Sequence, residues 1–319
     1  MTLAYPIVGI DISSTALDAA ALDANGKFRA LSCANCKTEA RKLARQLAKM
    51  GTKLVVLEAT GGYELTVMTA LIAQGIPVAR VNPRQVRYFA KGIGRLAKTD
   101  PIDARVLATF GERARPRVTT LPSAEETQLK ALALRRRQLI DLRVAEKNHR
   151  TLVTDKAVAR SIDTVITALD KQITAFDAGI ATLVETNETM RVRRDLLDSV
   201  PGLGPVTIAT VIADLPELGD ASTSVLKALV GVAPFNADSG GVTGQRRIQG
   251  GRAPLRQALY MAAQTAYRHN PVIRTFYERL RGNGKSHKAT IIACIGKLVS
   301  IMNAIIKTET PFSKIRATA

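Results

Sequence analysis

Four carboxylates in the first third of the chain could act together on a phosphate group. Asp11 closes the first short apolar run and Glu58 closes a later one, so in a sheet both side chains can converge at the same strand ends. Asp100 and Asp103 are three residues apart, which places them on one helical face. Four carboxylates brought together repel one another, and Mg²⁺ or Mn²⁺ is the usual counter-charge at such oxygen-only sites. Two such ions, roughly 3.5–4 Å apart, can stabilise the entering and leaving oxygens of a phosphoryl transfer.

Each of these carboxylates also has a plain structural explanation. Asp11 could be a turn residue after a strand, and Asp100 could cap a helix whose first residue is Pro101. Gly61 and Gly62 would permit close backbone approach, either to nucleic acid or simply for a turn. The order of a strand-end Asp, a strand-end Glu and a helical Asp-x-x-Asp is more specific than any single member, and it favours a shared metal site.

A second constellation lies in a glycine-rich loop over residues 231–252, which holds a single serine, Ser239. Four arginines accompany it: Arg246, Arg247, Arg252 and Arg256. A serine in such a loop is ordinarily a turn residue, but these guanidinium groups could hold a phosphodiester and stabilise its developing charge. A hydroxyl that attacks phosphorus must also lose its proton, and no histidine lies close in sequence. We hypothesise that a metal ion or a carboxylate of the first domain activates Ser239.

The segment Val200–Val206 has the glycine pattern of a helix–hairpin–helix loop. Gly202 and Gly204 would let backbone N–H groups at a helix N-terminus meet DNA phosphates. The alternative is an ordinary helical turn with glycine at its C-cap.

The elements that must position these residues differ along the chain. The first 115 residues alternate strands and helices, and three antiparallel strands followed by βαβ units are typical of a ribonuclease-H-like fold. Strands are expected over Tyr5–Ile12, Ala16–Asp23, Lys27–Ser32, Lys53–Leu57 and Ile76–Val81, and helices over Thr38–Met50, Tyr63–Ala73 and Pro83–Ala90.

Ser123–Ala178 contains neither Gly nor Pro and must be mostly helix. Its second half and the residues that follow repeat apolar side chains at alternating spacings of four and three, an a/d heptad seam: Ile162, Ile166, Leu169, Ile173, Phe176, Ile180 and Leu183. A hairpin whose second arm forms a dimer and an internally packed helical pair both remain open. After Ser199 the pattern is mainly helical again, so we expect an α/β plus α architecture with domain boundaries near residues 122 and 195.

The charge of the chain indicates a polyanionic partner, of which nucleic acid is the commonest. The 319 residues carry 46 Lys+Arg against 27 Asp+Glu, a formal charge of +19, and the pI is near 10.2. Residues 239–319 alone hold 14 basic side chains against Glu278 and Glu309. A solvated basic face is the alternative.

Several protein classes are excluded by composition. A hydrophobic fraction of 46% and a charged fraction of 23% exclude wholesale disorder. No stretch approaches the roughly 18 uninterrupted apolar residues of a membrane span, and the N-terminus lacks the pattern of a secretory signal. Three cysteines cannot make a disulfide framework. We expect a cytoplasmic protein with no membrane partner.

Five motifs occur in the order and approximate spacing of one known family. They are Ile-Asp11-Ile-Ser, Leu-Glu58-Ala-Thr-Gly-Gly-Tyr63, Lys98-Thr-Asp-Pro-Ile-Asp-Ala104, Pro201-Gly-Leu-Gly204 and Ala233-Pro-Phe-Asn-Ala-Asp-Ser-Gly240. Over nearly its whole length the chain resembles the DEDD-type insertion-sequence transposases, also called bridge-RNA-guided recombinases.

The resemblance implies an architecture in three parts. Residues 1–122 would be a RuvC-like catalytic domain, residues 123–195 a coiled-coil segment and residues 196–319 a C-terminal transposase domain. It also implies a homo-oligomer, a dimer or a tetramer, with composite sites that combine the acids of one subunit with the serine of another.

The resemblance further implies roles for the candidate residues. Asp11, Glu58, Asp100 and Asp103 would bind Mg²⁺, and Ser239 would attack the DNA backbone to form a covalent phosphoserine link. A structured guide RNA encoded by the element would select double-stranded donor and target DNA by base pairing, while the protein contacts backbone and shape.

Three rival functions predict different behaviour. A RuvC-like junction nuclease that hydrolyses DNA with metal-activated water would share the carboxylates but would not need Ser239. An actin-like or sugar-kinase ATPase would need glycine-rich phosphate loops in two similar halves, which residues 123–190 interrupt. A non-catalytic nucleic-acid-binding protein would tolerate Asp11→Ala and need no metal.

Overall fold

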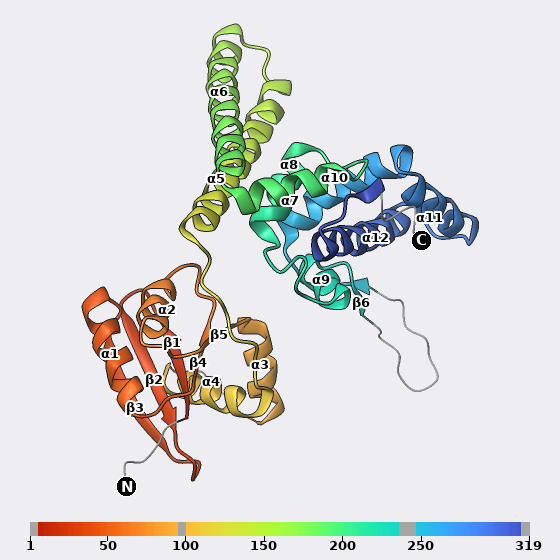
Figure 1. Ribbon diagram of the computed structural model, residues 1–319. Coiled ribbons are helices and arrows are strands. Elements are labelled where there is room, and N and C mark those ends of the chain that lie inside the picture. The colour runs from red at the N-terminus through yellow and green to blue at the C-terminus, as the bar shows by residue number, and fades with distance from the viewer. Residues whose placement is uncertain (1–5, 95–99, 236–246, 314–319) are drawn as a thin grey trace. The chain divides into compact units, whose positions relative to one another are not determined.

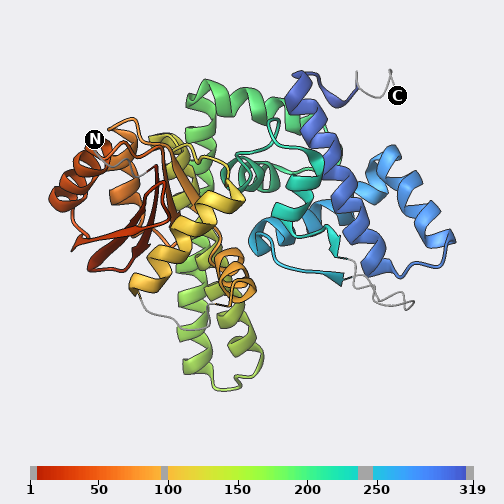
Figure 2. The ribbon, with the colours of Figure 1, turned by 90° about the horizontal axis from the view of Figure 1, so that it is seen from below.

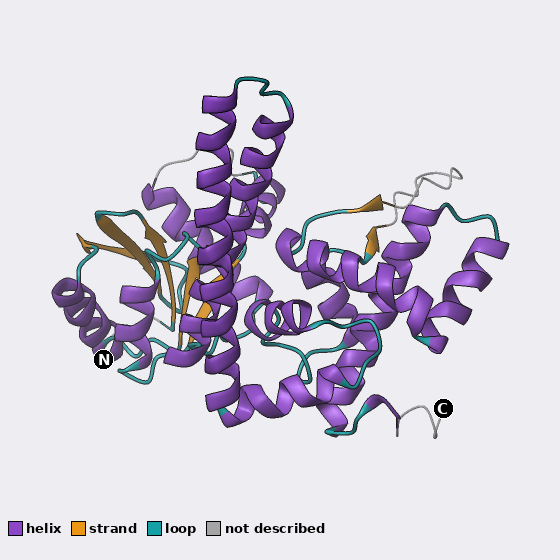
Figure 3. Ribbon diagram, turned by 90° about the horizontal axis from the view of Figure 1, so that it is seen from above, coloured by secondary structure: helices purple, strands orange, loops and turns teal. Residues whose placement is uncertain are grey.

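The structure is a computed structural model that describes residues 6–94, 100–235 and 247–313 (Figure 1). The chain divides into two compact units, residues 1–121 and residues 122–319. The first unit is mixed α/β, whereas helices make up almost all of the second (Figure 3). The mixed α/β class predicted from the sequence is therefore confirmed.

A five-stranded mixed sheet forms the centre of the first unit. Its strands are β1 (Ile7–Ile12), β2 (Ala16–Leu22), β3 (Phe28–Ala34), β4 (Leu54–Glu58) and β5 (Val78–Val81). They lie in the order β3-β2-β1-β4-β5, with β1 to β3 as an antiparallel meander and β4 and β5 parallel to β1. The predicted meander followed by parallel crossover units is present.

Four helices cover the sheet (Figure 2): α1 (Lys37–Lys49), α2 (Leu65–Ile72), α3 (Pro83–Gly92) and α4 (Asp100–Ala114). Because side chains alternate along a strand, the sheet has two buried faces. On one face, Val8 and Ile10 of β1 share a buried cluster with Leu47 of α1 and Met68 of α2. On the other, Val56 of β4 belongs to a cluster formed with α3 and α4.

Helix α4 lies directly on the sheet because glycines stand at the contact points. A Cβ on Gly9 would come within 2.1 Å of the Ala104 carbonyl oxygen, and a Cβ on Gly111 would lie 2.6 Å from Cγ2 of Val56 and 3.0 Å from Cγ2 of Ile7. Ala104 thus meets the middle of β1, and Gly111 meets its beginning. Helix α4 therefore runs antiparallel to β1, with its first turn toward the C-terminal end of that strand.

In the second unit, α5 (Ala124–Thr151) and α6 (Lys156–Thr186) form an antiparallel hairpin (Figure 3). Ion pairs join the two helices at seven-residue intervals: Arg136 with Asp177, Arg143 with Asp170 and Arg150 with Asp163. Ile173 and Ile180 of the heptad seam are buried, and Ile180 shares a cluster with Leu129 of α5. The seam is therefore used within the chain, which is the internally packed arrangement of the two that the sequence left open.

The remaining helices pack around one core. They are α7 (Glu188–Asp198), α8 (Pro205–Asp214), α9 (Thr223–Val230), α10 (Ala253–His269), α11 (Pro271–Gly282) and α12 (His287–Thr308). Two short strands, β6 (Pro234–Phe235) and β7 (Arg247–Ile248), pair with each other between α9 and α10 in the chain. Leu129 at the base of the hairpin belongs to the same buried cluster as Leu197 of α7, Leu259 of α10 and Leu298 of α12. The hairpin base and the C-terminal helices thus share a core.

Among the described helices, α12 alone is long and apolar enough to cross a membrane by length and composition. More than half of its apolar stretch is buried inside the unit. Ile295, Leu298 and Met302 are fully buried in the shared core. Helix α12 is accordingly packed as a core helix.

Candidate functional site

Asp11 and Glu58 lie next to each other at the ends of two parallel strands. β1 and β4 pair with Gly9 opposite Val56, and the two carboxylates follow two residues later on their respective strands. Gly9 and Val56 both face α4, and residues two apart on a strand share a face. The structure therefore brings Asp11 and Glu58 together on the face of the sheet that α4 covers.

Helix α4 carries the third carboxylate, Asp103. Ala104 packs against Gly9, and the half-buried Asp103 precedes it by one residue. Because α4 runs antiparallel to β1, its first turn lies toward Asp11. Asp100 begins the helix, but its side chain lies outside the described residues, so its place in the site stays a prediction.

The donor set suits a hard divalent cation, since all four predicted ligands are carboxylates. Within residues 6–94, 100–235 and 247–313, however, no three His, Cys, Asp or Glu side chains form a group that could hold a metal ion. The described residues thus supply a strand-end pair and a nearby helical Asp, not a complete ligand shell. The carboxylate oxygens that are present favour a divalent metal.

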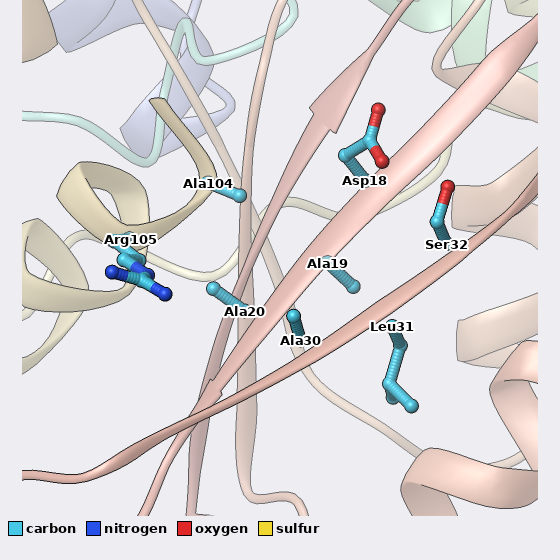
Figure 4. Close-up of a pocket in the computed structure, with 8 residues that line it drawn as sticks. All are labelled: Asp18, Ala19, Ala20, Ala30, Leu31, Ser32, Ala104 and Arg105. Carbon is cyan, nitrogen blue, oxygen red and sulfur yellow. The ribbon is translucent and has the colours of Figure 1, made fainter. Parts of the chain in front are cut away.

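One carboxylate missed by the sequence analysis lies directly beside Asp11. Asp18 of β2 is its antiparallel partner, and Ser32 of β3 is the partner of Asp18, so the three form a row on one face of the sheet. Asp18 and Ser32 line a cavity of about 310 Å³ together with Arg105 of α4, over a floor that is largely alanine (Figure 4). The signal that could have found Asp18 is hairpin register, because four residues connect the paired Ile12 and Leu17, which places residue 11 opposite residue 18.

The loop that follows Glu58 is organised by a buried carboxylate, Glu64. Its Oε2 accepts hydrogen bonds from Thr60 N (3.2 Å), Thr60 Oγ1 (2.9 Å) and Gly62 N (2.8 Å), and its Oε1 faces Nη1 of Arg80 at 3.4 Å. Burial would raise the pKa of Glu64, but the hydrogen bonds from its own N–H, Gly62 and Thr60 outweigh it and hold the pKa below its usual value. Glu64 is therefore ionised at neutral pH and fixes the loop next to the site.

Much of the predicted serine loop falls outside the described residues. Ser239 and Arg246 lie within residues 236–246, and of Arg247 only the backbone, in β7, is described. Their roles stay predictions.

The two described arginines of this loop are occupied by the protein itself. Arg252 donates to both carboxylate oxygens of Glu217, at 2.5 and 2.7 Å, and to the Asp214 carbonyl at 2.7 Å. Burial would raise the pKa of Glu217, yet Arg252 outweighs it and lowers that pKa. Arg256 donates to the Gly250 carbonyl at 2.6 Å. A phosphodiester would have to compete with these partners, so in this structure both side chains hold the edges of the loop.

The two glycines of the helix–hairpin–helix segment differ. Gly202 has φ +103° and a Cβ there would lie 2.6 Å from Cα of Ala266, so its small size serves close packing against α10. Gly204 is the N-cap of α8, is exposed, and would meet nothing within 4 Å. Only Gly204 has open space for an approaching phosphate.

Comparison with known proteins relates the chain to transposases. Residues 8–157 match the DEDD transposase family of IS110, and residues 194–278 match the transposase IS116/IS110/IS902 family. A pilin gene-inverting protein of Moraxella lacunata is 30% identical over 267 residues, which cover 82% of this chain and 82% of the relative. The transposase for insertion sequence element IS1111A of Coxiella burnetii is 23% identical over 297 residues, which cover 82% of this chain and 78% of that protein.

These matches confirm the family expected from the motifs. The first spans all four predicted carboxylates, and the second spans the helix–hairpin–helix segment and the serine loop. A transposase is an enzyme that cuts and rejoins DNA strands. The chain therefore belongs to the IS110 family of transposases.

Proposed function

We propose that the chain is a divalent-metal-dependent recombinase that cuts and rejoins DNA through Ser239. Asp11, Glu58, Asp100 and Asp103 would hold Mg²⁺, which supplies positive charge for the reacting phosphate and favours ionisation of an attacking hydroxyl. The observation that carries the proposal is the adjacent placement of Asp11 and Glu58 under α4, in a chain that DEDD-type transposases match.

The proposed reaction conserves phosphate ester bonds. The Ser239 oxygen forms a bond to the DNA phosphorus while the bond from phosphorus to a deoxyribose oxygen breaks. The serine proton passes to a carboxylate or to water, and the leaving oxygen takes up a proton. A deoxyribose hydroxyl of another strand can then attack the phosphoserine, which releases Ser239 and seals the new joint.

Cleavage of donor and target DNA by wild type, Ser239→Ala and Asp11→Asn tests this proposal. Denaturing gels are probed for DNA attached to protein. We expect an adduct that requires Mg²⁺ and is absent from both variants. Nicking without an adduct, unchanged in Ser239→Ala, would refute the serine step and favour the junction nuclease with metal-activated water. Wild-type activity in excess EDTA would refute the metal.

A structured RNA encoded by the element is the proposed guide that selects donor and target. The basic surplus of residues 239–319 supports a polyanionic partner besides the reacting phosphate. Omission of the candidate RNA from the cleavage assay should abolish site-specific cutting. Site-specific cutting that persists without RNA would contradict this part of the proposal.

Duplex DNA is proposed to bind a surface on α10–α12, here called the cationic surface. It consists of six exposed basic side chains: Arg268, Arg274, Arg279, Arg281, Lys285 and Lys288. None of the six forms an ion pair with another described residue, whereas six arginines of α5–α7 do. Unpaired like charges repel one another until a polyanion neutralises them.

An aromatic cluster holds the three helices of the cationic surface together. Tyr267 of α10 and Tyr277 of α11 are stacked with centroids 4.6 Å apart, and Tyr277 Oη lies 2.7 Å from Nδ1 of His287 on α12. These contacts hold α10, α11 and α12 in a fixed arrangement, so the cationic side chains can contact phosphates at fixed spacings.

The double variant Lys285→Ala/Lys288→Ala tests this surface, with Lys147→Ala/Lys171→Ala on the exposed hairpin as matched control. Anisotropy titrations with duplex DNA over a range of salt should show weaker binding and a log–log salt slope reduced by about 2, since each lost phosphate contact contributes about 0.9. The control should bind as wild type does. Equal effects in both variants, or loss of RNA binding alone, would refute a DNA surface here.

The hairpin is proposed to join copies of the chain in a dimer or tetramer. Six large apolar side chains on α5, α6 and their connecting loop are exposed: Leu134, Leu142, Val144, Leu152, Val158 and Val165. Six exposed apolar side chains on one hairpin favour burial of that hairpin against another protein surface. Leu142→Glu should shift sedimentation toward monomer; an unchanged distribution would refute association through the hairpin.

A further inference from the structure

Asn35 joins the two loops that follow Asp11 and Glu58. It directly follows β3, and its Nδ2 donates to the carbonyl of Ser13 at 2.8 Å and to the carbonyl of Tyr63 at 3.3 Å. Ser13 is two residues beyond Asp11, and Tyr63 is five beyond Glu58. One side chain thus connects the loops that follow both carboxylate-bearing strands.

Hydrogen bonds inside each of the two connected loops fix the shape of that loop. In the first, Ser13 Oγ accepts the N–H of Ala16 at 2.9 Å, and Ser13 N donates to the Ala16 carbonyl at 3.0 Å. In the second, Oε2 of Glu64 accepts hydrogen bonds from the backbone N–H groups of Thr60 and Gly62. The Asn35 amide thus joins two loops that are each fixed internally, just beyond the last paired residues of β1 and β4.

The chemistry of the bridge requires two donors on a short side chain. Both partners are carbonyl oxygens, which only accept hydrogen bonds, and a primary amide supplies two N–H groups. The other amide atom, Oδ1, is buried and finds no hydrogen-bond partner among the described residues, which costs stability. Asn35 therefore donates two hydrogen bonds through Nδ2, while its Oδ1 acceptor has no partner among the described residues.

We propose that Asn35 is a positioning residue that sets the spacing of Asp11 and Glu58 for binding of a divalent cation. This inference rests on the proposed metal-binding role of those two carboxylates. Residues that orient metal ligands through hydrogen bonds change metal affinity or activity by about 10–100-fold when they are replaced.

Asn35→Ala and Asn35→Gln test the inference in the full chain, with Asn25→Ala as matched control. Asn25 is exposed in the β2–β3 turn, at the opposite end of the sheet. Free Mn²⁺ is followed by electron paramagnetic resonance during titration, and thermal melting is recorded without metal. Asn35→Ala should bind Mn²⁺ about 10–100-fold more weakly than wild type, with a melting temperature close to wild type. Asn35→Gln keeps the amide and should recover part of the affinity.

The outcomes separate this inference from the proposed function. Loss of Mn²⁺ binding in Asp11→Asn with wild-type binding in Asn35→Ala would overturn the positioning role alone. A large fall in melting temperature with unchanged Mn²⁺ affinity would show that Asn35 is merely structural. Mn²⁺ binding that survives in Asp11→Asn, or is lacking in wild type, would overturn the metal site itself, and the role of Asn35 with it.

Discussion

Glu64→Gln should destabilise the first unit by about 2–3 kcal/mol at neutral pH. The carboxylate accepts three hydrogen bonds at Oε2 and faces Arg80 at Oε1, and it is only 3% exposed. A hydrogen bond to a charged group contributes about 1 kcal/mol more than a neutral one. Glutamine keeps an acceptor for Thr60 and Gly62, but it loses the charge and turns an N–H group toward Arg80. Glu64→Ala, which leaves all of these donors unsatisfied, should cost about 3–5 kcal/mol.

The effect should depend on pH in a defined direction. The pKa of Glu64 is lower in the folded chain than its usual value, so the ionised form stabilises the fold. That stabilisation is complete above the unfolded pKa of about 4.3 and is lost as pH falls through the folded pKa. Glutamine does not titrate. The difference in unfolding free energy between wild type and Glu64→Gln should therefore shrink as pH falls below about 4.3 and through the folded pKa.

Hydrogen exchange of the full chain measures this effect locally, because amides of the β4–α2 loop report opening of the first unit. Glu112→Gln, which changes an exposed carboxylate on α4, is the matched control and should leave exchange unchanged. A difference between Glu64→Gln and wild type that stays constant with pH would refute the assignment of an ionised, hydrogen-bonded Glu64. Equal exchange at neutral pH would refute its role in the loop altogether.

Three further predictions follow from packing and burial. Gly9→Ala should destabilise the first unit by several kcal/mol, since its Cβ would lie 2.1 Å from a carbonyl of α4; a wild-type melting temperature would refute this contact. Arg252→Ala should lower the unfolding free energy by about 1–3 kcal/mol in urea titrations, and unchanged stability with lost DNA binding would instead indicate a phosphate contact. Burial raises the pKa of the Cys294 thiol to about 11, so a thiol reagent at pH 8 should label exposed Cys36 at once and Cys294 only after unfolding; rapid labelling of Cys294 in the native chain would contradict its burial.

The sheet could be predicted because its determinants are local. The turn at Asp23, Asn25 and Gly26 lies between two apolar runs and specifies an antiparallel hairpin, and Asp23 Oδ1 indeed accepts the N–H groups of Asn25 and Lys27. Glu58 ends β4, as its position after an apolar run indicates. Composition and alternation of this kind are visible in any short window of sequence.

Partners distant in sequence could not be predicted in the same way. The heptad seam of α6 indicates a facing helix but not which one, and the structure supplies α5 of the same chain. Arg252 was expected to hold a phosphodiester because of its loop, whereas its partner is Glu217, a carboxylate that only the fold brings near. The type of a residue shows which groups its side chain can bind, but only the fold shows which of these groups lies within reach.

The close contact between β1 and α4 at Gly9 and Gly111 has a consequence for how the first unit folds. Ala104 and Gly9 are nearly a hundred residues apart in sequence, yet they are in direct backbone contact. The β1–β2–β3 meander is local and can form early, whereas docking of α4 closes a long loop and must come late. Asp103, in the first turn of α4, is brought toward the strand ends of Asp11 and Glu58 only in that last step. In a nascent or partly unfolded chain Asp103 is therefore far from the strand-end carboxylates, and the proposed metal site forms only once the whole unit has folded.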